Sequence, residues 1–428
     1  MSTDSRYSLI TECYGSISRA LDWIVTRFPE SETRVKYYCN DVTGTSFTLS
    51  SLANIFGKGY DRFNSTLSEH NRDSPFESVD DFVKSFQNHL EYETYVKNYL
   101  NILLNPLIPW MYLNHDLEKV VWGCRACGRR FECLYIFKEI LSFLNPQSYT
   151  ATNTLNHSVF MNCRNKIADV LEKYLISSNN GTGWAYYTKD KENVDPYVTA
   201  RLLEFFYDWN DHIREFRFKI DFGKDSEVFQ KCLETVKNIQ QKDDFTQKYN
   251  LIDDINVKGG WKEIQWGQFP VWRIKGASHI AEILYKIEGK KSNEIENAKS
   301  FLETAFGDKV SQSDVTIFSD GYTATVSDVT GTIGLVSFYL SLGHEFGISP
   351  DSKSVVSRIK WLIEEQRQSD GAWPVLSKEL WKQERSKDSK ILRKRILSPE
   401  DMSNNNVSIC NTMLMINTLI KFVQKILS

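Results

Sequence analysis

The chain has 428 residues, of which 41% are hydrophobic and 13% aromatic, so it can bury a large core. Its formal net charge of −3 gives no overall reason to expect a nucleic acid or an anionic membrane as a partner. It has no run of about 18 apolar residues that would cross a bilayer. The N-terminal sequence lacks the pattern of a secretory signal, and the eight scattered cysteines suit a reducing compartment, so we expect a cytoplasmic protein.

Apolar residues recur at helical spacing along the whole chain, and the expected helices fall into six pairs. In each pair, a turn containing glycine and polar residues separates the first helix from the second. The first helices are expected at about 16–28, 95–113, 159–175, 226–241, 295–308 and 355–368. The second helices are expected to begin near residues 44, 129, 199, 276, 330 and 407. We also expect an extra helical segment at about 66–92.

A single helix pair cannot bury its apolar stripe, so repeated pairs must stack on one another. Six pairs suit a closed ring, with the first helices outside and the second helices inside. Small residues near the starts of the second helices permit close approach there, at Gly44, Ala200, Ala277 and Gly331. The sequence therefore predicts an all-α fold in which residues 1–428 form a single (α/α)6 toroid. Periodicity alone does not distinguish this ring from an open solenoid.

The helix that ends near residue 366 leads into the most distinctive turn of the chain. Trp361 and Leu362 precede Gln366, and Gly371 and Trp373 follow it as Gly-x-Trp. This spacing resembles the QW repeat of squalene and oxidosqualene cyclases. In physical terms, the glutamine would bind backbone at a helix end while the tryptophan covers the turn, so that adjacent repeats are tied together.

Other parts of the chain carry shorter versions of this repeat. The Gly-Trp pairs at 183–184 and 260–261 look like degraded copies, and residues 19–25 match only its opening. The resemblance implies the α/α toroid that class II terpene cyclases share with the β subunits of protein prenyltransferases. The sequence argues against protein prenylation itself, because Cys410 at the last helix lacks the Asp and His partners of a zinc site.

A second resemblance concerns residues 325–336, TVSDVTGTIGLV. This stretch is similar to the segment of oxidosqualene cyclases that carries the catalytic acid, although Val329 and Gly331 depart from it. The matching residues are Val326, Ser327, Asp328 and Thr330. The resemblance implies that Asp328 protonates an epoxide or alkene of an isoprenoid, as in a cyclase of the isomerase or lyase class. Such an acid must stay protonated in a desolvated pocket with aromatic walls.

The sequence itself favours a helix N-cap role for Asp328 over that of a catalytic acid, because similar Asp-containing stretches occur at 40–45 and 194–200. The three-Asp acid motif of squalene cyclases is absent from the sequence, and the chain has helices for one toroid where those enzymes have two. Two functions therefore stay open. One is a divergent cyclase that acts on a hydrophobic small molecule through Asp328. The other is a non-catalytic toroid that binds a ligand or a protein within a larger complex.

Two further patterns bear on metals and cofactors. Cys124 and Cys127 resemble half of a zinc knuckle, but a structural zinc needs four ligands, and buried thiols at a helix start are the alternative. Asp253 and Asp254 are interpreted as a solvated turn, because no second metal-binding motif accompanies them. The chain has no glycine-rich phosphate loop. We therefore predict no metal and no cofactor.

The segment 378–396 contains eight basic and three acidic residues and interrupts the last helix pair. In a toroid, the loops between outer and inner helices gather on one rim, so this insertion is expected to project from that rim. Large apolar residues in it, among them Trp381, Ile391, Leu392 and Ile396, indicate that part of it packs on the domain or on a partner. Its basic residues favour an anionic partner surface over a small neutral substrate.

Overall fold

The computed structural model describes the N-terminal helix and most of the C-terminal half of the chain. The described residues are 3–26, 168–169, 171–185, 192–244, 246–247, 255–265, 269–304, 314–317, 323–374, 376–379 and 409–427. They are mostly helical, as the sequence predicted. Several expected features lie outside the described residues: the second helices near 44 and 129, the segment 66–92, Cys124 and Cys127, Asp253 and Asp254, and residues 380–396 of the basic insertion.

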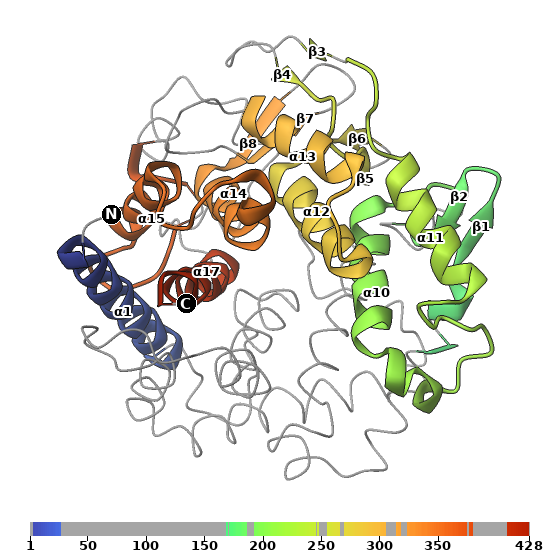
Figure 1. Ribbon diagram of the computed structural model, residues 1–428, viewed down its shortest axis with the longest axis horizontal. Helices are drawn as coiled ribbons and strands as arrows, with labels where there is room; N and C mark the ends of the chain where they lie inside the picture. The colour runs from blue at the N-terminus through green and yellow to red at the C-terminus, as the bar shows by residue number, and fades with distance from the viewer. Residues whose placement is uncertain are drawn as a thin grey trace.

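The described helices form two layers (Figure 1). The inner layer consists of α10 (Pro196–Asp208), α12 (Ile274–Glu288), α14 (Asp328–Leu342) and α17 (Ile409–Leu427), which contact one another in this order. The outer helices are α11 (Glu227–Asn238), α13 (Asn293–Thr304), α15 (Lys353–Glu365) and α1 (Thr3–Thr26). They pack on α10, α12, α14 and α17, respectively. The alternation along the chain is the predicted one, and the inner helices begin two or three residues from the predicted positions 199, 276, 330 and 407.

Contacts at both ends of α10 and α12 show that these inner helices run parallel. Near their first turns, Tyr197 Oη of α10 lies 3.3 Å from His279 Nδ1 of α12. Near their last turns, Lys286 Nζ of α12 lies 2.7 Å from an oxygen of Asp208 on α10. An antiparallel pair would bring the start of one helix to the end of the other, so the intervening outer helix α11 must return the chain.

The same relationship holds between α14 and α17. Thr330 in the first turn of α14 donates a hydrogen bond to Asn411 Oδ1 of α17 at 2.7 Å. Toward the other ends of these helices, Lys421 of α17 donates to Ser341 of α14. The inner layer is therefore a parallel set of helices, each reached through an antiparallel outer helix, as a ring or solenoid of helix pairs requires.

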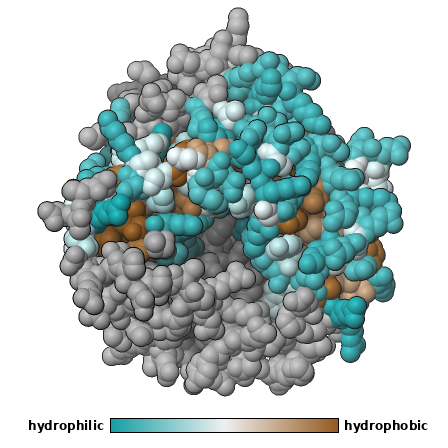
Figure 2. All heavy atoms as spheres, in the orientation of Figure 1, coloured by the Kyte–Doolittle hydropathy of each residue, from teal (hydrophilic) through white to brown (hydrophobic). Residues whose placement is uncertain are grey.

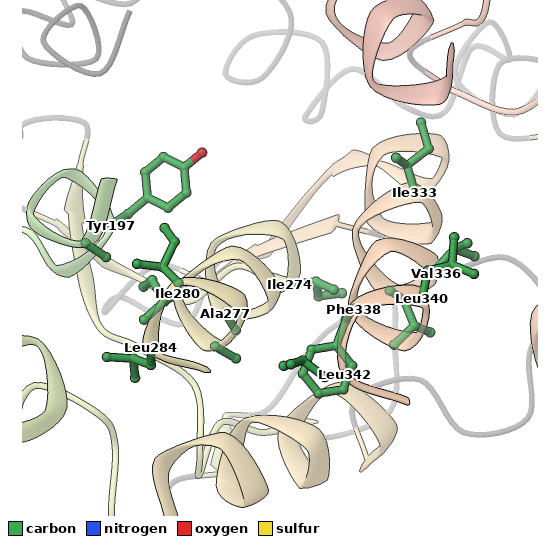
Figure 3. Close-up of a cluster of buried hydrophobic side chains, with 14 of the residues drawn as sticks. Tyr197, Ile274, Ala277, Ile280, Leu284, Ile333, Val336, Phe338, Leu340 and Leu342 are labelled. Atoms are coloured by element: carbon green, nitrogen blue, oxygen red, sulfur yellow. The ribbon is translucent and has the colours of Figure 1, made fainter. Parts of the chain in front are cut away.

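Apolar packing between the layers explains why α14 is the most enclosed of the described helices. Most of its side chains are buried, because α12, α15 and α17 all contact it. Figure 3 shows Phe338 and Leu342 of α14 on the side of α12, where Ile274 lies. The outer helices instead carry one apolar stripe each, and two of them begin at serine caps: Ser226 accepts from the backbone of Phe229 in α11, and Ser352 accepts from that of Val355 in α15.

Short antiparallel strand pairs occupy the loops between the described helices. They are β1 (Ile176–Ser178) with β2 (Gly181–Gly183), β3 (Thr246–Gln247) with β4 (Ile255–Asn256), β5 (Glu263–Gln265) with β6 (Phe269–Val271), and β7 (Asp314–Ile317) with β8 (Thr323–Ser327). The 3-10 helices η2 (Asn210–Phe216) and η3 (Gly343–Phe346) follow α10 and α14. Over the described part of the chain, no helix combines the length and apolar character that a bilayer crossing needs.

Candidate functional site

The turn after α15 is held by the side chain of Gln366, which is fully buried. Its Nε2 donates to the backbone carbonyl of Ser16 at 2.8 Å and to that of Gly371 at 2.7 Å. Its Oε1 accepts a hydrogen bond from Arg19 at 2.8 Å. One amide therefore closes its own turn and binds the helix α1 from the opposite end of the chain.

Trp373 completes this turn. Its indole nitrogen donates to the carbonyl of Leu362 in the last turn of α15 at 2.6 Å, and its backbone nitrogen donates to Thr412 Oγ1 in α17 at 2.9 Å. The ring is fully buried. These contacts confirm the roles expected of the two side chains: Gln366 binds backbone groups, and Trp373 covers the end of the outer helix.

Gln240 makes the corresponding contacts after α11, and the sequence analysis missed it. Its Nε2 donates to the carbonyl of Gly259 at 2.9 Å and to that of Glu294 in α13 at 2.7 Å. Its Oε1 accepts from Asn297 at 3.4 Å. Trp261 then donates its indole N–H to a carbonyl near the end of α11, at 2.8 Å. Residues 241–258 separate Gln240 from Gly259, so the sequence does not show the spacing of the repeat here.

Glycine is required at both turns for the same reason. Gly259 and Gly371 have φ values of +87° and +79°, a region that favours glycine. A Cβ at Gly259 would lie 2.0 Å from the carbonyl oxygen of Asn297, and one at Gly371 would lie 2.3 Å from that of Arg19. The backbone of the following outer helix thus contacts each turn directly. By this correspondence, α1 follows α15 in space as α13 follows α11.

A third copy of the turn follows the helical residues near 171. Trp184 donates its indole N–H to the carbonyl of Leu171 at 2.9 Å and its backbone N–H to Thr199 Oγ1 at 3.0 Å. Gly181 packs on Thr235 of α11, whose hydroxyl accepts from the backbone of Thr182 at 2.9 Å. The tryptophans of the Gly-Trp pairs at 183–184 and 260–261 therefore both donate the indole N–H to a carbonyl of the preceding helical segment, as Trp373 does.

Asp328, the sequence-predicted catalytic acid, is the first residue of α14 and is only 3% exposed. Its Oδ1 accepts hydrogen bonds from the backbone nitrogens of Ser377 at 2.8 Å and Val329 at 3.0 Å, and the Ser377 hydroxyl also binds the carboxylate. Burial raises the pKa of Asp328, and these hydrogen bonds oppose the rise only in part. The carboxylate thus joins the start of α14 to the segment that follows Trp373.

A second buried carboxylate, which the sequence analysis did not single out, lies beside it. Glu365 Oε2 accepts the backbone N–H of Lys378 at 2.7 Å, so Asp328 and Glu365 bind consecutive amides of residues 377 and 378. Burial raises the pKa of Glu365, and the charge of Asp328 adds to that rise. The sequence signal was the acidic residue directly before Gln366. Together the two carboxylates hold the backbone at residues 377 and 378, where the predicted insertion 378–396 begins.

The inner helices also share a polar face that the neighbouring described helices leave partly exposed. We call it the inner polar stripe, and its residues recur at spacings of three, four or seven along each helix. They are Arg201, Glu204 and Asp208 of α10, His279, Glu282 and Lys286 of α12, Thr330, Ser337 and Ser341 of α14, and Asn417 and Lys421 of α17. Figure 2 shows hydrophilic side chains over most of the coloured surface of the molecule on the viewed face.

Ion pairs between helices link the residues of this stripe. Lys286 binds Asp208 at 2.7 Å and Glu204 at 3.2 Å, and Glu204 also binds Arg201 at 3.1 Å. Burial would lower the pKa of Lys286, but the two carboxylates outweigh burial and raise the pKa above its ordinary value. The lysine therefore stays charged while its side chain is only 34% exposed.

A second group of polar contacts continues the stripe across α12, α14 and α17. Glu282 Oε2 accepts from the hydroxyl of Ser341 at 2.7 Å and lies 3.4 Å from Lys421 Nζ. The phenylalanine side chains of these inner helices lie elsewhere. Phe205, Phe206, Phe338 and Phe422 are at most 1% exposed and belong to the core between the helices. The stripe is therefore a charged and hydroxylated surface, with Tyr197 at its edge.

Among the residues that the structure describes, no group of three or more His, Cys, Asp or Glu side chains is arranged to hold a metal ion. The inner polar stripe can form hydrogen bonds and charge pairs with a ligand, and the two buried carboxylates, Asp328 and Glu365, can bind protons. A comparison with models of known protein families gives no match, and a search of curated proteins gives no significant similarity.

Proposed function

We propose that the protein is a cytoplasmic α/α toroid that binds a charged or strongly polar ligand, or a protein segment of that character, on its inner polar stripe. The observation that carries this proposal is the set of ion pairs between Lys286, Glu204 and Asp208 and between Lys421 and Glu282. A polar ligand can exchange hydrogen bonds and charge pairs with this surface, whereas a hydrocarbon would desolvate its charges without compensation.

The parallel inner helices and the position of α1 support the closed ring. The helix α1 packs against the turn after α15 as α13 packs against the turn after α11. In both places a glycine of the turn lies against the backbone of the next outer helix. An open solenoid would leave its first outer helix away from its last pair. In a ring, the faces of α10, α12, α14 and α17 that carry the stripe point to a shared centre, where one ligand can contact several helices.

A thermal-shift screen tests the binding function. The panel contains charged metabolites and peptides on one side and isoprenoid alcohols, squalene and oxidosqualene on the other. We expect charged compounds to raise the melting temperature, and Lys421→Gln to abolish the shift. Lys299→Gln is the matched control, because Lys299 forms a comparable pair with Glu303 at 2.9 Å on the outer helix α13. Stabilisation by the isoprenoids alone would contradict the proposal.

The second candidate function is the cyclase, which one observation favours. Asp328 is buried and its pKa is raised, which is the condition that a proton donor to an alkene or epoxide requires. Under this alternative, Asp328→Asn abolishes turnover of an isoprenoid substrate while the fold survives. Its contacts with Ser377 instead suit a structural role, in which Asn replaces Asp without loss of activity. Product analysis with squalene, oxidosqualene and prenyl diphosphates decides between these outcomes.

A further inference from the structure

Three different donor groups converge where the end of α12 meets η3. Tyr285 lies in the last turn of α12, and His344 and Glu345 lie in η3. The Tyr285 hydroxyl donates to Glu345 Oε1 at 2.5 Å, and His344 Nε2 lies 3.2 Å from both of these oxygens. The helices α12 and α14 lie side by side, which brings η3, just after α14, to the end of α12 (Figure 1). A phenol oxygen, a carboxylate oxygen and an imidazole nitrogen therefore form a compact triangle.

The backbone of η3 is held in place by its own turn and by the core. The Ile348 N–H donates to the Gly343 carbonyl at 2.8 Å, and Gly347 closes the turn with a φ of +69°. Phe346 stacks its ring on Phe338 of α14, with the ring centroids 6.0 Å apart. Because these contacts fix the backbone on both sides of the two η3 donors, the triangle needs little further ordering to bind an ion.

The size of the triangle suits a transition-metal ion. Nitrogen and oxygen ligands lie about 2.0–2.2 Å from a bound Zn²⁺. A circle through three atoms with these separations has a radius of about 1.7 Å, so a point about 1.2 Å from their plane lies about 2.1 Å from all three. The side chains of His344 and Glu345 are 58% and 28% exposed, so water can reach the remaining coordination positions of an ion at this point.

We propose that Tyr285, His344 and Glu345 form a binding site for a divalent transition-metal ion, Zn²⁺ or Cu²⁺. One imidazole nitrogen with two oxygens suits these ions, whereas Ca²⁺ takes six to eight oxygens and Mg²⁺ keeps several of its waters. The ion replaces the protons that the three groups now share, and these protons pass to solvent. The site contains no residue of the inner polar stripe, so it does not depend on the function proposed for that surface.

The sequence analysis predicted no metal, and the structure shows why these residues escaped it. Tyr285 lies 59 positions before His344 and 60 before Glu345, so the three share no motif. Only the parallel packing of α12 and α14 brings them together. With Glu345 ionised and His344 neutral, the three groups carry one negative charge, which favours a dication.

The test titrates the full chain with Zn²⁺ and with Cu²⁺ by isothermal titration calorimetry, with Mg²⁺ as an ion that should not bind. The readout is the binding that a single substitution removes, so metal held elsewhere on the chain does not interfere. We expect His344→Ala and Glu345→Gln each to weaken binding of both ions at this site at least about tenfold. Glu303→Gln is the matched control, because Glu303 is a partly exposed carboxylate that binds Lys299 on α13. It should leave the affinity unchanged.

Copper supplies a second readout that a hydrogen-bonded cluster would not produce. A phenolate bound to Cu²⁺ absorbs visible light by charge transfer to the metal, and Tyr285→Phe should remove this absorption while it keeps the ring. Wild-type affinity in both His344→Ala and Glu345→Gln would overturn the proposal and leave a hydrogen-bonded cluster only. Dissociation constants above about 1 mM for both ions would overturn it too. So would copper binding without the phenolate absorption, because the tyrosine would then not be a ligand.

Discussion

The side-chain nitrogen of Gln366 lies 2.8 Å from the carbonyl oxygen of Ser16, although 350 positions separate the two residues. The equivalent contact of Gln240, with the carbonyl of Glu294, joins residues only 54 positions apart. The same kind of hydrogen bond thus joins two outer helices that follow each other in sequence in one place, and two outer helices that are far apart in sequence in the other. The contact between α15 and α1 therefore follows the rule by which the protein joins successive units.

Replacing Gln366 by Ala should lower the free energy of unfolding by roughly 2–4 kcal/mol, because two buried carbonyls lose their donor and Arg19 loses an acceptor. Gln240→Ala should cost a similar amount, since its side chain makes the same kinds of contact. Urea unfolding followed by circular dichroism measures both. A loss below about 0.5 kcal/mol, the range of ordinary surface substitutions, would show that these amides do not hold the units together.

Gly371→Ala should be far more costly than Gly347→Ala. Both glycines have positive φ, +79° and +69°, so both variants incur the backbone strain of about 1–2 kcal/mol. A Cβ at Gly371 would also lie 2.3 Å from the Arg19 carbonyl oxygen, whereas nothing lies within 4 Å at Gly347. Melting temperatures of the two variants give the comparison. Equal losses would mean that α1 does not contact the turn as described.

The buried carboxylates should make the protein less stable as the pH rises. Asp328 and Glu365 have raised pKa values in the folded state, so the folded protein holds these protons more tightly than the unfolded chain. Their contribution is fully present below the ordinary pKa values of 3.8 and 4.5 and is lost as the pH passes the raised values. The free energy of unfolding, measured between pH 4 and 7, should therefore fall less steeply with pH for Asp328→Asn than for the wild type. Parallel curves of this free energy against pH would contradict the prediction.

Asp351 should have the opposite effect on the pH dependence of stability: its contribution should be lost as the pH falls. The Ser349 hydroxyl and the Arg6 guanidinium lower the pKa of Asp351 to about 2, so its contribution is present above pH 3.8 and is lost as the pH falls through 2. The pair is partly exposed, so we expect an effect on the order of 0.5 kcal/mol that high salt reduces. Asp351→Asn should remove both the acid dependence and the salt dependence, as measured by unfolding at pH 2–4.

Local sequence patterns predicted the parts of the fold that depend on neighbouring residues. The start of α14 was expected near 330 and lies at Asp328, because an apolar period and a polar cap are both local signals. The full repeat at Gln366 was found for the same reason. Gln240 was missed because the strand pair β3–β4 and its loop separate it from Gly259, so the spacing of the repeat is lost in sequence and restored in space.

The role of Asp328 could not be predicted from local sequence patterns. A helix cap and a buried acid have the same sequence, an Asp before small polar residues, and differ in what approaches them from elsewhere. Here the approaching group is Ser377, 49 positions away, which follows a turn set by Trp373. Glu365 directly precedes Gln366, but its sequence position does not show that it lies beside Asp328. Its proximity to Asp328 arises from the packing of α15 on α14, which no local period encodes.

The parallel arrangement of the inner layer has an electrostatic consequence. Each helix carries about +0.5 of an elementary charge at its N-terminus and −0.5 at its C-terminus, and these macrodipoles add when helices run the same way. Some of the charged side chains follow this polarity, whereas Glu204 and Asp208 near the C-terminal end of α10 oppose it. Asp195 and Asp328 lie at the N-terminal ends of α10 and α14, and Lys286 and Lys421 lie toward the C-terminal ends of α12 and α17. The two ends of this layer therefore differ in potential, and an anion and a cation approaching along its axis would prefer opposite ends.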